Sequence, residues 1–278
     1  MPELPEVETV RRGLERRALH RRFTSVAVTG RRTVRRHPSA ELSPALLGRQ
    51  VEAVRRKGKF LAVLLDGGTC LVIHLRMTGQ LLWVDDPTSP RAAHTHVVVG
   101  LDDGSELRFV DPRTFGEWYV TDAVDAEGLP SDFARLGPDP IVDGLTAATL
   151  AARLGRHKVA LKAALTDQTV VAGIGSIYAD EICFAARVRP DRRTDTLSRQ
   201  EIGRLARAAK AILARAIELR GSSLRDEQYR DLMGELGSFQ SRHKVYDRAG
   251  LPCRRCRASV SKIAFGARVA YCCESCQL

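Results

Sequence analysis

The stretch LPCRRCRASVSKIAFGARVAYCCESCQL (251–278) carries the most specific local signal in the chain and decides how its last part folds. Cys253 and Cys256 form one C-x2-C pair, Cys273 and Cys276 form another, and sixteen residues separate the pairs. This spacing is typical of a tetrahedral zinc ribbon. We therefore predict one structural Zn²⁺ held by these four thiolates, which leave no coordination position for a catalytic water.

The remaining cysteines point to other roles. Cys272 directly precedes the third predicted ligand and leaves the register of the second pair open. Cys70 lies in the strand-like run TCLVIHL and Cys183 in a helical run. We interpret these two as small buried apolar residues, not as ligands.

Length and composition indicate a multidomain protein of the cell interior. The 278 residues are 44% apolar, enough for more than one core. No run of eighteen apolar residues occurs, and the first residues carry carboxylates where a secretory signal would be basic and then apolar. We expect a cytoplasmic protein without a membrane segment.

The formal net charge of +11 is unevenly distributed along the chain. Residues 1–60 contain 15 Lys/Arg against 6 Asp/Glu, and residues 240–278 contain 8 against 2, whereas the middle is slightly acidic. Two basic ends suit a polyanion held between two parts of the molecule, because Lys and Arg displace counterions condensed on phosphates. Charge alone leaves solvated surface as an equal alternative.

The first part of the chain is predicted to be mainly β-structure after one helix. Val7, Val10 and Leu14 follow helical spacing directly after the N-terminus. From about residue 23 to 120, short β-branched runs alternate with Gly-containing turns, a pattern typical of antiparallel strands joined by hairpins. We expect an antiparallel β-sandwich with flanking helices over residues 1–121.

The second part is predicted to be helical. Residues 122–145 are rich in Pro, Gly and Asp and are interpreted as an interdomain linker. Runs rich in Ala, Leu and Arg with helical periodicity then occupy residues 146–239. Residues 240–278 form the four-cysteine finger. The fold class is therefore α+β with two domains and a small zinc-binding appendage.

Pro2 is a candidate nucleophile only if Met1 is removed. A small second residue normally permits that removal, and an α-amino group titrates near neutral pH, so part of it would be nucleophilic. Taken alone, Met-Pro-Glu is equally a good helix start.

The chain resembles the formamidopyrimidine-DNA glycosylase family, which includes endonuclease VIII. The resemblance covers almost the whole chain and rests on these segments, in the family's order: MPELPEVETVRRGL (1–14), RKGKFL (56–61), HLRMTG (74–79), DPRTFG (111–116), LGPDP (136–140), DQTVVAGIGSIYADE (167–181), SFQSRHKVYDRAGLPCRRC (238–256) and CCESCQ (272–277). It implies a helix-two-turn-helix element in the helical domain and a β-hairpin in the finger.

The resemblance implies a catalytic set. Pro2 matches the amine that attacks the deoxyribose C1′, expels the damaged base and forms a Schiff base. Glu3 matches the acid that protonates the sugar ring oxygen, with Glu6 beside it. Lys59 matches the proton donor in β-elimination, and Arg268 matches the finger arginine that binds phosphate and serves δ-elimination.

The resemblance also implies DNA contacts, because an enzyme that acts on a base in a duplex must flip it out and fill the gap. Met77 and Phe115 match apolar wedges, and Arg113 matches the residue that faces the orphaned cytosine. Phosphate contacts fall on His94, His157, Lys162 and Ser176.

Two of these positions depart from the family's pattern. Ser176 stands where asparagine is usual, so the reach of an amide is lost. His157 stands where lysine is common and is mostly neutral at pH 7. Neither change removes a catalytic group.

The implied function is base-excision repair: removal of 8-oxoguanine and formamidopyrimidines from duplex DNA, followed by β,δ-elimination at the abasic site. A monomer acting on damaged double-stranded DNA in the bacterial cytoplasm is expected. Two alternatives stay open, an endonuclease VIII-like enzyme for oxidised pyrimidines and a non-catalytic DNA-binding zinc-ribbon protein. The Met77, Arg113 and Phe115 set and the loop at 221–239, which could cap a flipped purine, favour the purine enzyme.

Overall fold

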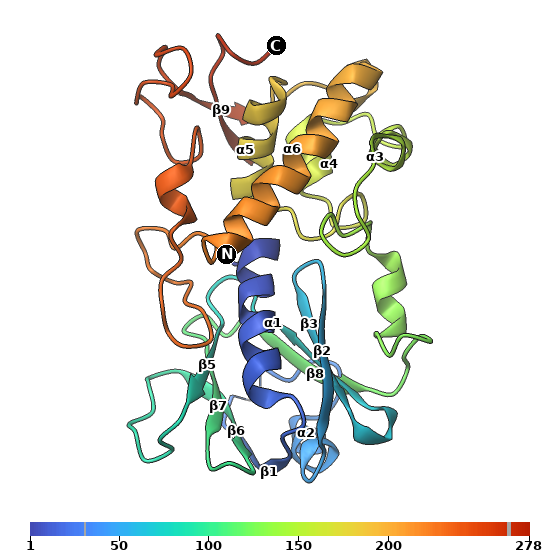
Figure 1. Cartoon of the computed structure of the whole chain (residues 1–278), viewed down its shortest axis with the longest axis vertical. Helices are drawn as coiled ribbons and strands as arrows, with labels where there is room; N and C mark the ends of the chain where they lie inside the picture. Colours follow the sequence, from blue (N-terminus) through green and yellow to red (C-terminus); the bar gives the residue numbers. More distant parts are fainter. Residues whose placement is uncertain (31, 266–267) are drawn as a thin grey trace. The chain divides into compact units, whose positions relative to one another are not determined.

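The computed structural model describes residues 1–30, 32–265 and 268–278, and the side chain of Arg268 lies outside that description. The chain divides into two compact units (Figure 1). The first comprises Met1–Ala134 together with Leu219–Ser238, and the second comprises Arg135–Glu218 together with Phe239–Leu278. The first unit is therefore discontinuous in sequence.

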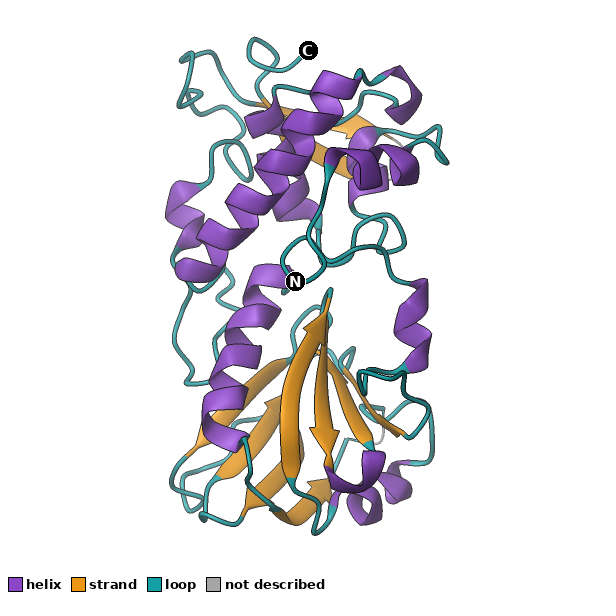
Figure 2. Cartoon of the chain, turned by 45° about the vertical axis from the view of Figure 1, so that its right-hand side comes forward, coloured by secondary structure: helices purple, strands orange, loops and turns teal. Residues whose placement is uncertain are grey.

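Two four-stranded antiparallel sheets form the first unit (Figure 2). One sheet has the order β1 (Phe23–Val28), β6 (Thr95–Leu101), β7 (Glu106–Val110) and β5 (Gln80–Val84). The other has the order β2 (Val51–Lys57), β3 (Phe60–Leu65), β4 (Cys70–His74) and β8 (Glu117–Thr121). Buried side chains from both sheets and from the flanking helices join in a single cluster. The expected β-sandwich is confirmed.

Two helices flank the sandwich, α1 (Leu4–Ala18) and α2 (Ser39–Leu46). Helix α1 contacts β2 and β3, and it buries Val7, Val10 and Leu14 as their spacing predicts. Its first turn begins with a capping box in which Glu3 is the N-cap and Glu6 reaches back to the Glu3 backbone. The start of α1 is thus fixed by the same two carboxylates that the sequence singles out for chemistry.

The second unit contains the helices α3 (Ala147–Leu154), α4 (Leu161–Leu165), α5 (Ser176–Ala186) and α6 (Arg199–Glu218). Helix α6 packs against α3 and α5. The chain ends in the antiparallel hairpin of β9 (Ser261–Phe265) and β10 (Arg268–Cys272), and β10 contacts α5. No helix in the described ranges combines the length and apolar character needed to span a bilayer.

Two predicted domain boundaries differ from these units. The predicted linker 122–145 is split, since its first part stays with the sandwich up to Ala134. Residues Leu219–Ser238, which the sequence assigns to the helical domain, belong with the sandwich. The reason is packing: Leu232 is 1% exposed within the sandwich core, and its carbonyl accepts a hydrogen bond from Trp83 N–H at 2.8 Å.

Candidate active site

The N-terminal corner of the first unit brings Glu3, Glu6 and Lys59 together. The Glu6 carboxylate accepts the Glu3 backbone N–H at 2.8 Å and the Ser222 backbone N–H at 2.7 Å, and it is 1% exposed. Gly221 makes this contact possible, because a Cβ there would lie 2.6 Å from Glu6 Oε1 and its φ is +77°. The returning segment 219–238 therefore completes the corner.

Lys59 reaches this corner from the β2–β3 hairpin. Lys57 pairs with Phe60, so Gly58 and Lys59 form a two-residue turn, and Gly58 has φ +58° as such turns require. Burial lowers the pKa of Lys59, whereas the charges of Glu3 and Glu6 act in the opposite direction. A buried lysine with a depressed pKa can exchange a proton more readily than a solvated one.

A buried ion pair attaches the hairpin to α1. Arg56 Nε donates to Glu8 Oε2 at 3.0 Å, and Arg56 Nη1 donates to the Gly58 carbonyl at 2.8 Å. The Arg56 side chain is fully buried. Because Glu8 lies on the helix that starts at Glu3, this pair sets the distance between the helix start and the turn that carries Lys59.

Pro2 is buried at this corner, and Met1 precedes it with 45% exposure. As long as Met1 is attached, the Pro2 nitrogen is an amide and cannot attack a carbon centre. The nucleophile implied for this position therefore exists only after Met1 is removed.

Asp111 organises a second group of predicted residues. Its carboxylate, which is completely buried, accepts hydrogen bonds from Thr78 Oγ1 and from the backbone N–H groups of Arg113 and Gly116. Its own N–H donates to the His94 carbonyl at 3.0 Å. One side chain thus ties the turn after Met77 to the loop after strand β7.

The residues on these braced loops are exposed. Met77 is 39% and Phe115 42% exposed, unusual values for large apolar side chains, and the Arg113 guanidinium stacks 4.7 Å above the Phe115 ring. His94 is exposed as well and has a φ of +63°. Rigid loops that present apolar and cationic side chains to solvent suit insertion into a base stack.

In the second unit, Ser176 is the exposed first residue of α5, and Gly175 is its N-cap. The loop before it is braced by Gln168, whose amide accepts from Gly173 N–H and donates to the Ile174 carbonyl. A helix N-terminus favours an anion such as phosphate, because its backbone N–H groups and the helix dipole present positive charge. His157 is partly exposed, and its carbonyl accepts a hydrogen bond from Thr194.

Lys162 departs from its expected role as a surface phosphate contact. Its side chain is 3% exposed, and its Nζ bonds Asp180 Oδ2 at 2.8 Å and the Val269 carbonyl at 2.7 Å. Asp180 Oδ2 also accepts the Tyr271 N–H at 3.1 Å, and burial raises the pKa of Asp180 to about 7 although Lys162 acts to lower it. This ion pair holds the backbone of β10, whose first residue is Arg268, through the Val269 carbonyl and the Tyr271 N–H.

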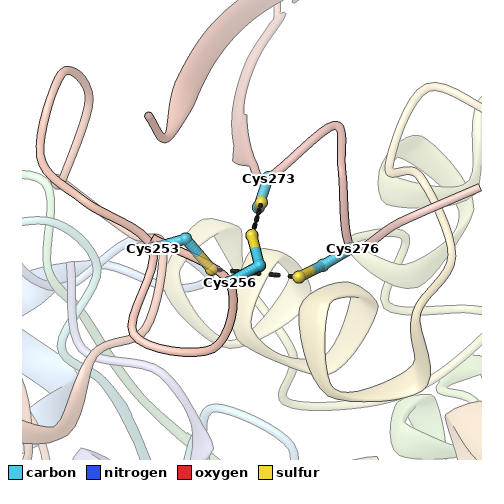
Figure 3. Close-up of side chains that lie close together, drawn as sticks. All are labelled: Cys253, Cys256, Cys273 and Cys276. Atoms are coloured by element: carbon cyan, nitrogen blue, oxygen red, sulfur yellow. Dashed lines mark hydrogen bonds between the residues drawn. The ribbon is translucent and has the colours of Figure 1, made fainter. Parts of the chain in front are cut away.

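The four predicted zinc ligands lie together (Figure 3). Their Sγ atoms are all within 4.8 Å of one another, with 4.0 Å from Cys253 to Cys276 and 3.4 Å from Cys256 to Cys273. Tetrahedral coordination at about 2.3 Å requires sulfur atoms about 3.8 Å apart, which fits this cluster. Cys272 is buried and stands outside the cluster, so the register uses Cys273. Cys70 and Cys183 are buried, as expected.

The sequence did not single out Asp111, Arg56 with Glu8, Asp180 or Gln168. Each is polar, buried or partly buried, and bonded to a residue far along the chain or to a loop backbone. No local pattern marks them: Arg56, for example, stands between Arg55 and Lys57 in a strand with four charged residues.

Comparison with known proteins agrees with this geometry. The chain matches the formamidopyrimidine-DNA glycosylase N-terminal domain over residues 1–118, the H2TH domain of the same enzymes over 136–228, and the zinc finger found in FPG and IleRS over 250–278. These three models together define the class as a DNA glycosylase with a helix-two-turn-helix and a zinc finger.

Full-length relatives narrow this class of DNA glycosylase to one family. A formamidopyrimidine-DNA glycosylase of Herpetosiphon aurantiacus is 43% identical over the whole of both chains. The crystal structure of the MutM (Fpg) protein from Thermus thermophilus superposes with a TM-score of 0.86 at 37% identity, covering 99% of this chain and 98% of that one. The Lactococcus lactis Fpg in complex with DNA that contains an abasic site gives 0.88 at 31% identity, with 99% of each chain covered. The chain belongs to the formamidopyrimidine-DNA glycosylase family.

Proposed function

We propose that this chain excises oxidised purines, 8-oxoguanine and formamidopyrimidines, from duplex DNA and then cleaves the abasic site by β,δ-elimination. The observation that carries the proposal is the N-terminal corner, where the start of α1 and the Lys59 turn are held against each other by buried polar contacts. The full-length likeness to an Fpg bound to Fapy-dG DNA supports the purine class of substrate.

Each residue of the corner receives one role. The Pro2 amine, once freed of Met1, attacks C1′ and displaces the base. After the sugar ring opens, the Pro2 nitrogen and C1′ form a Schiff base. Glu3 protonates the ring oxygen, and Glu6 orients the helix start by accepting the backbone N–H groups of Glu3 and Ser222. Lys59, with its lowered pKa, moves the proton in β-elimination.

In this proposal the second unit supplies contacts to the phosphate backbone of the DNA. Ser176 at the start of α5 and His157 bind phosphates, as does His94 from the first unit, while Arg268 binds the phosphate beside the lesion and serves δ-elimination. Lys162 holds the strand that bears Arg268 and touches no DNA, because its ammonium is already occupied. Zn²⁺, when bound by the four cysteines, keeps the hairpin folded.

DNA opening falls to the loops that Asp111 braces. Met77 and Phe115 fill the space left by the flipped nucleotide, and Arg113 faces the orphaned base. The identity of this set, Met77, Arg113 and Phe115, favours the purine enzyme over the endonuclease VIII-like alternative, and the exposure of Met77 and Phe115 is compatible with insertion. We further propose that the enzyme is a monomer of the bacterial cytoplasm, in keeping with its bacterial relatives.

Borohydride trapping tests this proposal. Protein shown by intact mass to lack Met1 is incubated with an 8-oxoguanine duplex, an oxidised-pyrimidine duplex and an undamaged duplex, each with sodium borohydride. A covalent adduct on the 8-oxoguanine duplex that disappears in Pro2→Gly is the expected result. A stronger adduct on the pyrimidine lesion would move the assignment to the endonuclease VIII type. The absence of an adduct on every lesion would favour the non-catalytic alternative.

A further inference from the structure

A cleft lies in the second unit, outside the residues used above. It is a cleft of about 400 Å³ whose lining comes from α5, α6 and the segment that follows Phe239. Its apolar lining includes Phe184, Ile212 and Phe239. The volume lies in the range of pockets that hold a small ligand or a large side chain, about 300–1,000 Å³.

Three exposed cations border the same cleft: Arg242, Lys244 and Arg255. None of them forms a salt bridge with a carboxylate in the described ranges of the chain. The Arg255 guanidinium lies 4.4 Å above the Phe184 ring, so one charge is held directly against the apolar surface. A fourth cation, Arg215, is paired with Glu218.

The acidic side chain in the lining, Glu181, is bonded to the backbone, and burial raises its pKa while the nearby Lys244 charge acts to lower it. Glu181 is 3% exposed, and its carboxylate accepts the backbone N–H groups of Lys244, Val245 and Tyr246, each at 2.9 Å. These bonds fix the backbone that carries Lys244. The cleft therefore presents an apolar interior and a rigid, positively charged border.

The position on α5 separates this cleft from the proposed phosphate contact. Ser176 begins the helix, and Phe184 lies eight residues later, which is about 12 Å along the axis. Phosphate binding needs cations and N–H groups but no apolar interior. A ligand with both a bulky apolar group and carboxylates makes better use of the lining.

We propose that this cleft docks an acidic peptide segment of a partner protein, in which carboxylates flank a bulky apolar residue. The apolar side chain enters between Phe184, Ile212 and Phe239, and the carboxylates pair with Arg242, Lys244 and Arg255. Such an arrangement of a buried anchor with a polar rim is typical of protein interfaces. It operates whether or not the chain has the excision activity proposed above.

The test uses the full-length, zinc-loaded protein and a fluorescein-labelled peptide of sequence Asp-Glu-Asp-Leu-Phe, followed by fluorescence anisotropy. Arg242→Glu and the cleft-filling Ala211→Trp are both expected to weaken binding by about tenfold or more. Lys210→Glu is the matched control, because it reverses a charge on exposed α6 surface outside the cleft. It should change the affinity by less than about twofold.

Two peptide controls and one competitor decide between occupants. Replacing the acidic residues by Ser, or Leu-Phe by Ala-Ala, should each weaken binding by about tenfold. Undamaged duplex DNA at saturation should leave the peptide affinity unchanged. The proposal is overturned if the acidic peptide does not bind, if Arg242→Glu and Lys210→Glu behave alike, or if the duplex displaces the peptide, which would make the cleft part of the DNA surface.

Discussion

The N-terminal corner and the finger hairpin are each anchored by a buried ion pair, but they rest on very different cores. Arg56 and Glu8 lie beside the large apolar cluster that fills the sandwich. Lys162 and Asp180 hold β10, and the cluster around the finger has only five buried residues among those described, two of them zinc ligands. The corner is therefore positioned by tertiary packing, whereas the finger depends on its four metal ligands and on the Lys162–Asp180 pair.

The largest expected effect follows from removing a thiolate. Cys273→Ser should abolish zinc binding and weaken binding to lesion duplex by about a hundredfold or more, because the finger has too little apolar surface to fold without metal. Zinc is measured by metal analysis and affinity by gel shift. The sandwich should keep its near-UV circular dichroism. Intact DNA binding in the metal-free variant would show that the finger is not needed for the grip.

Breaking the ion pair in the corner should come next. Arg56→Met removes the fully buried partner of Glu8, which keeps its bonds to Arg11 and Arg12, and should destabilise the protein by about 1.5–3 kcal/mol in urea unfolding. Arg12→Met is the control: Arg12 bonds the same carboxylate at 2.9 Å but is 50% exposed, so a loss below about 1 kcal/mol is expected. Equal losses in the two variants would contradict the positional role of Arg56.

The Lys162–Asp180 pair in the second unit allows its role in positioning β10 to be separated from its role in stability. Lys162→Met should lower DNA affinity about tenfold with zinc content unchanged, because the β10 backbone loses its contact at Val269. The double variant Lys162→Met/Asp180→Leu should regain stability, since an apolar pair replaces the charged one. If it regains DNA affinity as well, the pair contributes only stability.

The smallest effect is a pH dependence in the second unit. Burial lowers the pKa of His243 to about 4, below its ordinary value of about 6.5, so the unfolded chain binds more protons between those pH values. Stability should therefore fall by about 2 kcal/mol from pH 7 to pH 5. His243→Leu should remove this part of the slope in urea titrations at both pH values. An unchanged slope would show that His243 does not titrate in that window.

Much of the architecture could be predicted from local pattern. Strands with β-branched runs such as Thr95–Leu101, helices with 3.6-residue periodicity such as Arg199–Glu218, and the cysteine spacing are all properties of short segments. The strand Val51–Lys57 was not singled out, because its four charged residues hide the period of two, although Arg56 is 3% exposed.

What could not be predicted depends on partners distant in the sequence. In the sequence Lys162 resembles a phosphate contact, but in the structure it is paired with Asp180. Leu232 resembles a loop residue, but it lies in the sandwich core. Asp111 serves loops whose conformations no local motif specifies. Long-range polar pairs leave no periodic signal, so the sequence predicts the catalytic set only through family resemblance.

The discontinuous first unit has a consequence for synthesis on the ribosome. Residues 1–134 emerge first, but Ser222, Tyr229 and Leu232 are made about a hundred residues later, a delay of about 5–20 s at ordinary elongation rates. Until then Glu6 lacks the Ser222 N–H donor, and the sandwich core lacks the side chains of Tyr229 and Leu232. A nascent or truncated chain therefore cannot complete the corner around Pro2.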